Sequence, residues 1–303
     1  MERNDGQEDN RQGVMFAVIA AIVGSILFSC KGILTKAGMA HGATALGMLS
    51  LRMVYAAPVY AAVLMWSLRR KPIPTKHVAQ AAGLGLLGCY LSPTLNFYGL
   101  GMVSASLERV LIHACPALII LVAWFYGREK LSRFTLAALA VCYAGVTLSC
   151  LGRDGGHANA NPVGVASILV GCIVYAFFVV ASVGMQRKMG TFAFTSSAML
   201  ASSLACSVQN VVCGSTAFML HPPREIVPIA IALALLCTVA PAYLTTYGFR
   251  VLGASKSAVY SMVGPLLTPV LAMLVLGERM SAPQVGGFAL VFTGGILLSR
   301  RGA

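Results

Sequence analysis

Five ionisable side chains interrupt the long apolar runs of this sequence, and they are the residues best able to do chemistry. They are Lys31, Arg52, Glu108, Arg109 and His113. A charged side chain at the centre of a lipid bilayer costs about 2.5–3.5 kcal/mol on insertion scales, so each of them needs a partner or a purpose. All five fall in the first half of the chain, and the later apolar runs carry no ionisable residue well inside them.

Arg52 is the strongest candidate for a binding residue, because it lies about nine residues inside the apolar run 43–66. We predict that Arg52, with Arg109 or Lys31, attracts an anionic group such as a carboxylate within a water-filled cavity. The alternative is a buried ion pair of Glu108 with Arg52 or Lys31 that fixes helix packing. For Lys31 and Arg109, a further alternative is extension of the side chain to the outer lipid headgroups.

Glu108 and His113 are the candidates for proton coupling. Glu108 is the only acid within a predicted helix, and the unperturbed pKa of histidine lies near physiological pH. For His113 the alternative role is that of a hydrogen-bonded packing residue. Arg109, His113 and Pro116 recur at positions i, i+4 and i+7, which predicts that they share one helix face.

Prolines and tyrosines inside the predicted helices are further site candidates. A proline frees a backbone carbonyl that lipid cannot satisfy, so its kink should face protein or a water-lined cavity. Four prolines fall at matching places in the two halves and are predicted gating kinks, with a plain helix bend as the alternative: Pro93, Pro116, Pro241 and Pro265. Four tyrosines are predicted to line the same cavity and bind substrate: Tyr90, Tyr175, Tyr243 and Tyr260.

Composition places much of this protein in lipid. Of the 303 residues, 58% are hydrophobic and only 10% are charged, with a mean hydropathy of +0.81. A soluble domain carries about 25% charged residues. The net charge of +13 does not indicate a nucleic-acid partner, because the basic residues sit in short gaps between apolar runs. The nine cysteines are scattered without a C-x-x-C pair, so we predict no metal site, no disulfide and no cofactor.

The apolar runs predict an all-α integral membrane protein. A membrane-spanning helix needs about 20 apolar residues. Ten segments fit, at approximately 14–34, 43–66, 78–99, 104–126, 134–152, 163–185, 192–213, 227–248, 255–276 and 284–299. With a cytoplasmic N-terminus, nearly all Lys and Arg residues of the loops fall on the cytoplasmic side, which predicts that both termini are cytoplasmic. The polar residues 1–13 are unlike a signal peptide and are predicted to form a cytoplasmic tail.

A repeat organises the chain. Residues 105–148 align without a gap on residues 254–297, at an offset of 149, and eleven of the forty-four positions are identical. The informative matches are a proline, an acid that precedes a base, and a late glycine: Pro116/Pro265, Glu129/Glu278 and Gly145/Gly294. One unit of five predicted helices is therefore used twice.

The repeat carries the functional prediction. Because five is an odd number, the second copy must cross the membrane in the opposite sense to the first. Inverted repeats build secondary transporters, with the substrate site near the membrane midplane between the halves. We therefore predict a first repeat over 14–152 and a second over 163–299, which expose the site to either side in turn.

The order of these motifs resembles the EamA-type permeases of the drug/metabolite transporter superfamily. The matching features are Lys36, Arg52, Tyr98-Gly99-Leu100, Ala105-Ser106, Pro116, Gly127 with Glu129, Gly145, Gly277-Glu278-Arg279 and Gly294. Two departures are the extra Arg128 in Gly127-Arg128-Glu129, and Glu108-Arg109 where the second copy has Ser257-Ala258. The resemblance implies export or exchange of a small polar metabolite, such as an amino acid or related carboxylate, across a bacterial inner membrane.

Other classes of protein have less support. An integral-membrane enzyme acting on a lipid-linked substrate is the main alternative, but no H-E-x-x-H, G-x-S-x-G or acid cluster is present. A Walker motif is also absent from the sequence, so the expected driving force is a gradient of substrate or protons. Gly83-Leu-Gly85-Leu-Leu-Gly88 spells a dinucleotide-binding pattern but lies within a predicted helix, where glycines favour close packing. The expected partners are a small-molecule substrate and membrane lipid, with a homo-oligomer as one option.

Overall fold

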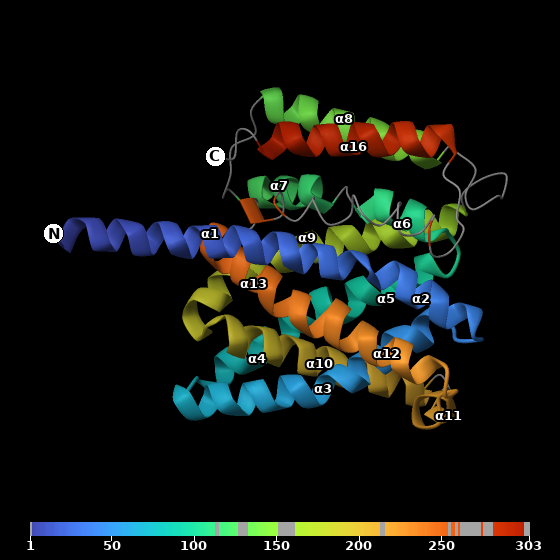
Figure 1. The fold of residues 1–303 in the computed structure, drawn as a ribbon, viewed down its shortest axis with the longest axis horizontal. Coiled ribbons are helices and arrows are strands. Elements are labelled where there is room, and N and C mark those ends of the chain that lie inside the picture. Colours follow the sequence, from blue (N-terminus) through green and yellow to red (C-terminus); the bar gives the residue numbers. More distant parts are fainter. Residues whose placement is uncertain are drawn as a thin grey trace.

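The computed structural model describes residues 2–112, 115–126, 133–150, 161–212, 216–253 and 281–299, together with 256–257, 260 and 274. Every regular element in this part of the chain is helical (Figure 1). The elements are α1 (Glu2–Ser29), α2 (Lys31–Ala40), α3 (Ala45–Arg70), α4 (Thr75–Gly85), η1 (Leu86–Leu91), α5 (Ser92–Leu100), α6 (Ala105–Ile112), α7 (Cys115–Phe125), α8 (Arg133–Cys150), α9 (Pro162–Met189), α10 (Thr191–Val212), α11 (Thr216–Leu220), α12 (Ile226–Ala234), η2 (Leu235–Val239), α13 (Ala240–Leu252) and α16 (Ala282–Ser299).

Six helical stretches in the described residues are long and apolar enough to cross a membrane. They are Gly13–Ala40, Ala45–Arg70, Thr75–Leu100, Pro162–Met189, Thr191–Val212 and Ile226–Leu252. A helix satisfies its own backbone hydrogen bonds, which is the requirement for crossing lipid. The predicted all-α membrane class is therefore confirmed for the described residues.

The remaining predicted segments have different outcomes. The fourth and fifth overlap two shorter apolar helices, Val110–Phe125 and Leu136–Leu148, and the last overlaps α16. Segment 255–276 lies almost wholly outside the described residues. The polar residues that we assigned to a tail continue the first helix, because α1 begins at Glu2.

Local sequence signals fix the ends of several helices. The side chain of Thr44 caps α3 by accepting a hydrogen bond from Gly47 N, and Asn161 caps α9 in the same way. Helix α9 ends with Arg187 and Lys188 in its last turn, where positive charge is favoured by the helix dipole. The chain then turns at Gly190, whose φ of 84° suits glycine.

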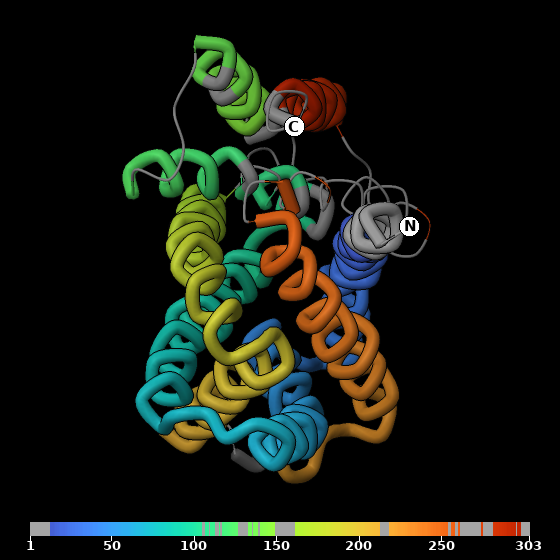
Figure 2. The backbone as a smooth tube through the Cα atoms, turned by 90° about the vertical axis from the view of Figure 1, so that its left-hand side faces the viewer, coloured from blue at the N-terminus to red at the C-terminus, as the bar shows by residue number. Residues whose placement is uncertain are grey.

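Helix pairs recur in the two halves of the molecule. Helix α1 packs against α13, and α9 packs against α5. The offset of 149 residues relates α1 to α9 and α5 to α13, so these are two copies of one pairing. Helix α3 also packs against α10, and α8 against α16. Figures 1 and 2 show α8 and α16 side by side at one edge of the molecule.

The repeated late glycine forms the contact between α8 and α16. A Cβ added at Gly145 would lie 2.6 Å from the carbonyl oxygen of Gly287, and one at Gly294 would lie 2.8 Å from the carbonyl oxygen of Ala138. The thiol of Cys142 also donates to the carbonyl of Val291, at 3.5 Å. The glycines therefore let two backbones approach closely, as small residues do between membrane helices.

Substitution of Gly145 by alanine is expected to destabilise the protein by about 1–3 kcal/mol, because the new methyl group meets backbone atoms that cannot move aside. The matched control is Gly286→Ala on α16, where an added Cβ meets only the end of Leu148, at 3.4 Å. Thermal unfolding of the purified variants in detergent measures the difference. Equal midpoints for the two variants would contradict the close contact.

Two π-helical segments occupy matching positions in the halves. Segment η1 and segment η2 are related by the same offset of 149, and each is followed closely by a proline, Pro93 or Pro241. Pro93 has no N–H to donate to the carbonyl of Cys89, four residues earlier. The hydroxyl of Ser202 on α10 donates to that carbonyl instead. The freed backbone group is thus satisfied within the protein.

The glycine pattern before Pro93 serves packing. A Cβ added at Gly85 would lie 2.4 Å from Cα of Ala198, and one at Gly88 would lie 1.9 Å from Cγ of Phe178. A Cβ at Gly83 would meet nothing within 4 Å. Gly85 therefore lets α10 approach α4 closely, and Gly88 lets α9 approach η1 closely, as predicted for this motif.

We expect Gly88→Ala to destabilise the protein by about 1–3 kcal/mol, because the whole Phe178 ring must shift. Gly83→Ala on the preceding turns should be neutral, or stabilising by up to about 1 kcal/mol, since alanine favours helix. Adding Phe178→Leu to Gly88→Ala should recover part of the loss. Thermal unfolding of the four proteins tests this, and a Gly88→Ala midpoint equal to that of Gly83→Ala would contradict it.

Candidate functional site

A buried cavity of about 230 Å³ lies among the helices. Its wall includes residues of α1, α2, α3, η1 and α5 from the first half, and of α9, α10 and α13 from the second. Drug-sized ligands occupy sites of about 300–1,000 Å³. The cavity is therefore the right size for a small metabolite.

Arg52 lies on the cavity wall in the buried part of α3 and is only 3% exposed. Its guanidinium carbon lies 4.9 Å from the ring centroid of Phe97. Among the described residues it has no ion-pair partner, and its Nε makes no hydrogen bond. A buried cation without a counterion is costly. This arrangement leaves a positive charge available to a ligand in the cavity.

Lys31 also lies on the wall, but its charge is already compensated. It begins α2, where the first spanning helix is interrupted at Cys30. Its Nζ lies 3.2 Å from Oε1 of Glu108 and donates to Oδ1 of Asn96 at 2.6 Å. The ammonium group also lies 4.9 Å from the Phe97 ring centroid. Glu108 is fully buried and is not part of the cavity wall.

These contacts distinguish between the alternatives for the charged residues. The ion pair of Glu108 is made with Lys31, and no Arg52–Glu108 pair occurs. Extension of Lys31 to the headgroups is wrong, because the apolar span continues to Ala40 and Lys31 is buried. Arg109 lies on α6, but its side chain is outside the described part of the chain. The whole of His113 lies outside the described residues.

The predicted tyrosines occupy different environments. Tyr175 lies on the cavity wall. Tyr90 and Tyr243 pack against a neighbouring apolar cluster that contains Tyr60, and the Tyr243 hydroxyl lies 2.8 Å from Oγ of Ser196. None of Tyr90, Tyr243 and the 38% exposed Tyr260 lines the cavity. Their contact with substrate stays a prediction.

Two of the predicted proline kinks line the cavity. They are Pro93 and Pro241, which follow the π-helical segments η1 and η2. Pro116 lies on α7 with its side chain outside the described atoms, and Pro265 lies outside the described residues. The Thr245 hydroxyl donates to the carbonyl of Pro241 at 2.7 Å, so this wall carbonyl is also occupied.

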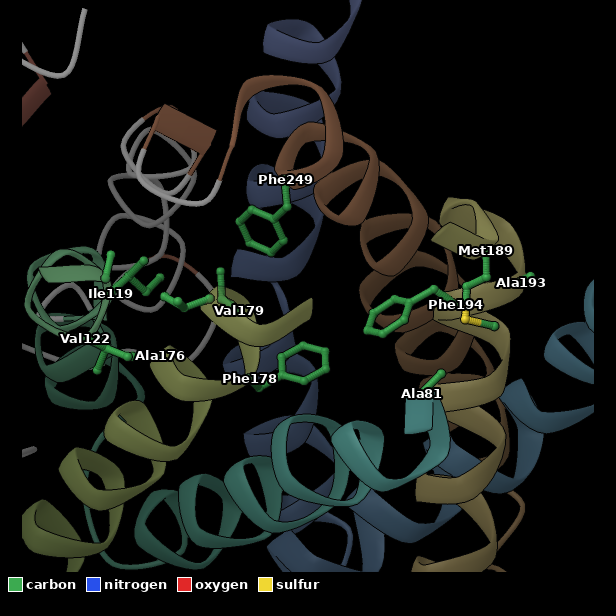
Figure 3. Packing of buried hydrophobic residues seen from close by; sticks show 12 residues of the cluster. Ala81, Ile119, Val122, Ala176, Phe178, Val179, Met189, Ala193, Phe194 and Phe249 are labelled. Atoms are coloured by element: carbon green, nitrogen blue, oxygen red, sulfur yellow. The ribbon is translucent and has the colours of Figure 1, made fainter. Parts of the chain in front are cut away.

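An aromatic part of the wall was not predicted. The rings of Phe178, Phe194 and Phe249 come from α9, α10 and α13 and approach a common space (Figure 3). The centroids of Phe178 and Phe194 are 6.1 Å apart with an interplanar angle of 23°, and the Tyr175 centroid lies 5.9 Å from that of Phe178. These rings belong to a different apolar cluster from Phe97, over which the two cations lie.

The cavity thus combines a cationic region with an aromatic one. Its described wall contains Lys31 and Arg52 but no Asp or Glu. Within the described residues no group of three potential metal ligands occurs. The geometry is suited to hold an anion by charge and an apolar body by contact. Asn96, which accepts a hydrogen bond from Lys31, is one of several polar wall residues that our site prediction omitted.

Membrane-length helices that surround a cavity with cations on its wall define an integral membrane protein. A sequence model of the EamA-like transporter family matches residues 15–151 and again residues 162–300, so the chain belongs to that family. The resemblance to EamA-type permeases of the drug/metabolite transporter superfamily is confirmed. The family is one of transporters.

Known proteins similar to the chain agree with this assignment. The uncharacterized transporter YcbK of Bacillus subtilis (strain 168) is 29% identical over 288 residues, which are 91% of each chain. The uncharacterized transporter sll1319 of Synechocystis sp. is 23% identical over 80% of this chain and 76% of its own length. A solved crystal structure, 18% identical, shares the fold with a TM-score of 0.69 over 94% of this chain and 98% of that one.

Proposed function

We propose that the protein is a secondary transporter that carries a small anionic metabolite through the central cavity by alternating access. The observation that supports this most is Arg52, a buried cation without a described counterion on the wall of a cavity built from both halves. An arginine in such a place is favoured only if a ligand supplies the missing negative charge during the transport cycle.

The proposed architecture is ten spans in two inverted repeats, with both termini in the cytoplasm of a bacterial cell. The equivalent pairings α1–α13 and α5–α9 support the repeat. Cysteine labelling from either side of the membrane tests the inversion at positions 130 and 279, the bases that follow the repeated Glu129 and Glu278. The two positions should label from opposite sides, and labelling from the same side would overturn the inverted arrangement.

Counterflow in proteoliposomes tests the transport function. Vesicles loaded with an unlabelled mixture of carboxylates and amino acids should accumulate the labelled form of the substrate without ATP, because exchange needs no other energy source. Empty vesicles supply the control. If no labelled anion or amino acid accumulated, while labelled water showed intact vesicles and electrophoresis showed inserted protein, the proposal would be wrong. The enzyme alternative has no observation in the described wall that favours it.

A further inference from the structure

We infer that the transported anion is a monocarboxylate with an apolar or aromatic body and no ammonium group. A 2-oxo acid fits this description, and the amino acid of the same side chain does not. This inference rests on the proposed function and specifies its substrate class. It depends on two features of the wall: its charge balance and its aromatic region.

The charge balance favours a ligand with one negative charge. The described wall carries two cations, Arg52 and Lys31. Glu108 pairs with Lys31 at 3.2 Å, which leaves the charge of Arg52 to be balanced. A monoanion balances it, whereas a zwitterion brings a further positive charge close to Arg52. At short range in a poorly solvated site, repulsion between like charges is strong.

Glu108 is the only carboxylate within the predicted spans, and it is already paired with Lys31, so a substrate ammonium group would have to compete for it. The sequence has nine acidic residues, and Glu108 is the only one between Asp9 and Glu129. The later acids, Asp154, Glu225 and Glu278, lie beside predicted or observed helix ends. The absence of further acids from the predicted spans holds for the whole sequence. A buried ammonium group without a partner loses its hydration without compensation.

Three neutral acceptors of the wall already accept a hydrogen bond. The proline-freed carbonyl of Cys89 accepts from Ser202, and the carbonyl of Pro241 accepts from Thr245. The amide oxygen of Asn96 accepts from Lys31. The hydroxyl of Thr195 on the same wall has no hydrogen-bond partner among the residues that the structure describes, but a neutral hydroxyl alone compensates little of the charge of a substrate ammonium group.

The aromatic region supplies contacts for the rest of the ligand. Phe178, Phe194 and Phe249 converge on one part of the wall (Figure 3). Burial of an apolar group there is favourable in proportion to the area removed from water. A carboxylate near Arg52 with a branched or aromatic body against these rings would use both regions at once.

Two matched pairs of compounds test the inference in proteoliposome counterflow. The pairs are 4-methyl-2-oxopentanoate with leucine, and phenylpyruvate with phenylalanine. In each pair the carboxylate and the body are retained, and only the oxo or ammonium group differs. We expect the oxo acid to be transported at least about tenfold faster than its amino acid, because a site that leaves a buried polar group unpaired discriminates strongly. Pyruvate should be a poorer substrate than either oxo acid.

A variant in the aromatic region tests the contact with the apolar body of the ligand separately from the contact with its carboxylate. Phe194→Ala should reduce phenylpyruvate transport at least about threefold more than pyruvate transport, because it removes apolar contact and no charge. Thermal unfolding shows whether the variant is folded. If it does not fold, competition by pyruvate and phenylpyruvate in the unchanged protein gives the same comparison.

The outcomes distinguish this inference from the proposed function. Leucine or phenylalanine transported as fast as its oxo acid would overturn the inference and leave the transporter proposal in place. No flux and no thermal stabilisation with any of the five compounds would also overturn the inference, while flux of another anion would keep the transporter proposal. Failure of every tested anion and amino acid to exchange would overturn both.

Discussion

Replacement of Arg52 by methionine is expected to reduce transport strongly and to leave the protein at least as stable as before. The guanidinium group is 3% exposed and has no ion-pair partner among the described residues. Methionine fills a similar space without the cost of burying a charge, and replacing buried ionic groups by apolar ones has stabilised other proteins by about 1–4 kcal/mol. A residue retained at such a cost serves a function, which we expect to be contact with the substrate anion.

The measurement for Arg52→Met is counterflow together with thermal unfolding of the ligand-free protein. We expect a loss of flux of about ten- to a hundredfold or more, since a hydrogen bond to a charged group contributes about 1.5–3 kcal/mol. Arg69→Met is the matched control, because Arg69 is exposed near the end of the same helix α3 and should retain full activity. Full flux with Arg52→Met would exclude Arg52 from the site. A marked fall in its midpoint would show that Arg52 holds the fold instead.

The length of the predicted span and the distance of Arg52 from its ends were sufficient to single out Arg52. The run 43–66 had to span the membrane, and a position about nine residues inside it is too deep for its side chain to reach water. The structure indeed buries this residue in α3. The first predicted helix ended at residue 34, because Lys36 and His41 lower the hydropathy after that residue. Lys31 therefore appeared close enough to the helix end to reach the lipid headgroups. The observed span continues to Ala40.

The direction in which side chains point was harder to predict. Successive residues of an α-helix differ by about 100° in direction, and a π-helical turn shifts the helix face again. Tyr90 lies in η1, where the neighbouring Cys89 faces the cavity and Tyr90 does not. Phe178 and Phe194 were missed because a phenylalanine facing lipid and one facing a cavity look alike in an apolar run. Tertiary packing alone separates the two.

The partner of Glu108 was left open for a related reason. Lys31 and Arg52 are both basic residues inside predicted helices, and depth alone does not say which helix α6 approaches. The structure places α6 against α2, so that Lys31 meets Glu108, while Arg52 remains on the wall. The proposed binding role of Arg52 is therefore compatible with a packing role of Lys31. The sequence had presented them as competing explanations.

Substitution of Lys31 by methionine is expected to destabilise the protein by about 3–5 kcal/mol, the usual result of removing one partner of a buried ion pair. The carboxylate of Glu108 would remain at 0% exposure without the ammonium group of Lys31. Lys76→Met is the control, because Lys76 is exposed on α4 and should have little effect. Thermal unfolding in detergent and the yield of inserted protein are the measurements.

The double variant Lys31→Met/Glu108→Leu decides what the pair does. If the pair serves packing, the double variant should recover most of the stability lost by Lys31→Met, because it removes both buried charges of the pair. Additive losses would contradict a direct interaction at 3.2 Å.

The pH dependence of flux in the double variant tests proton coupling at Glu108. A folded double variant with the original pH profile would exclude Glu108 as the coupling group, whereas a flat profile would assign that role to it, since the only acid inside the predicted helices has then been removed.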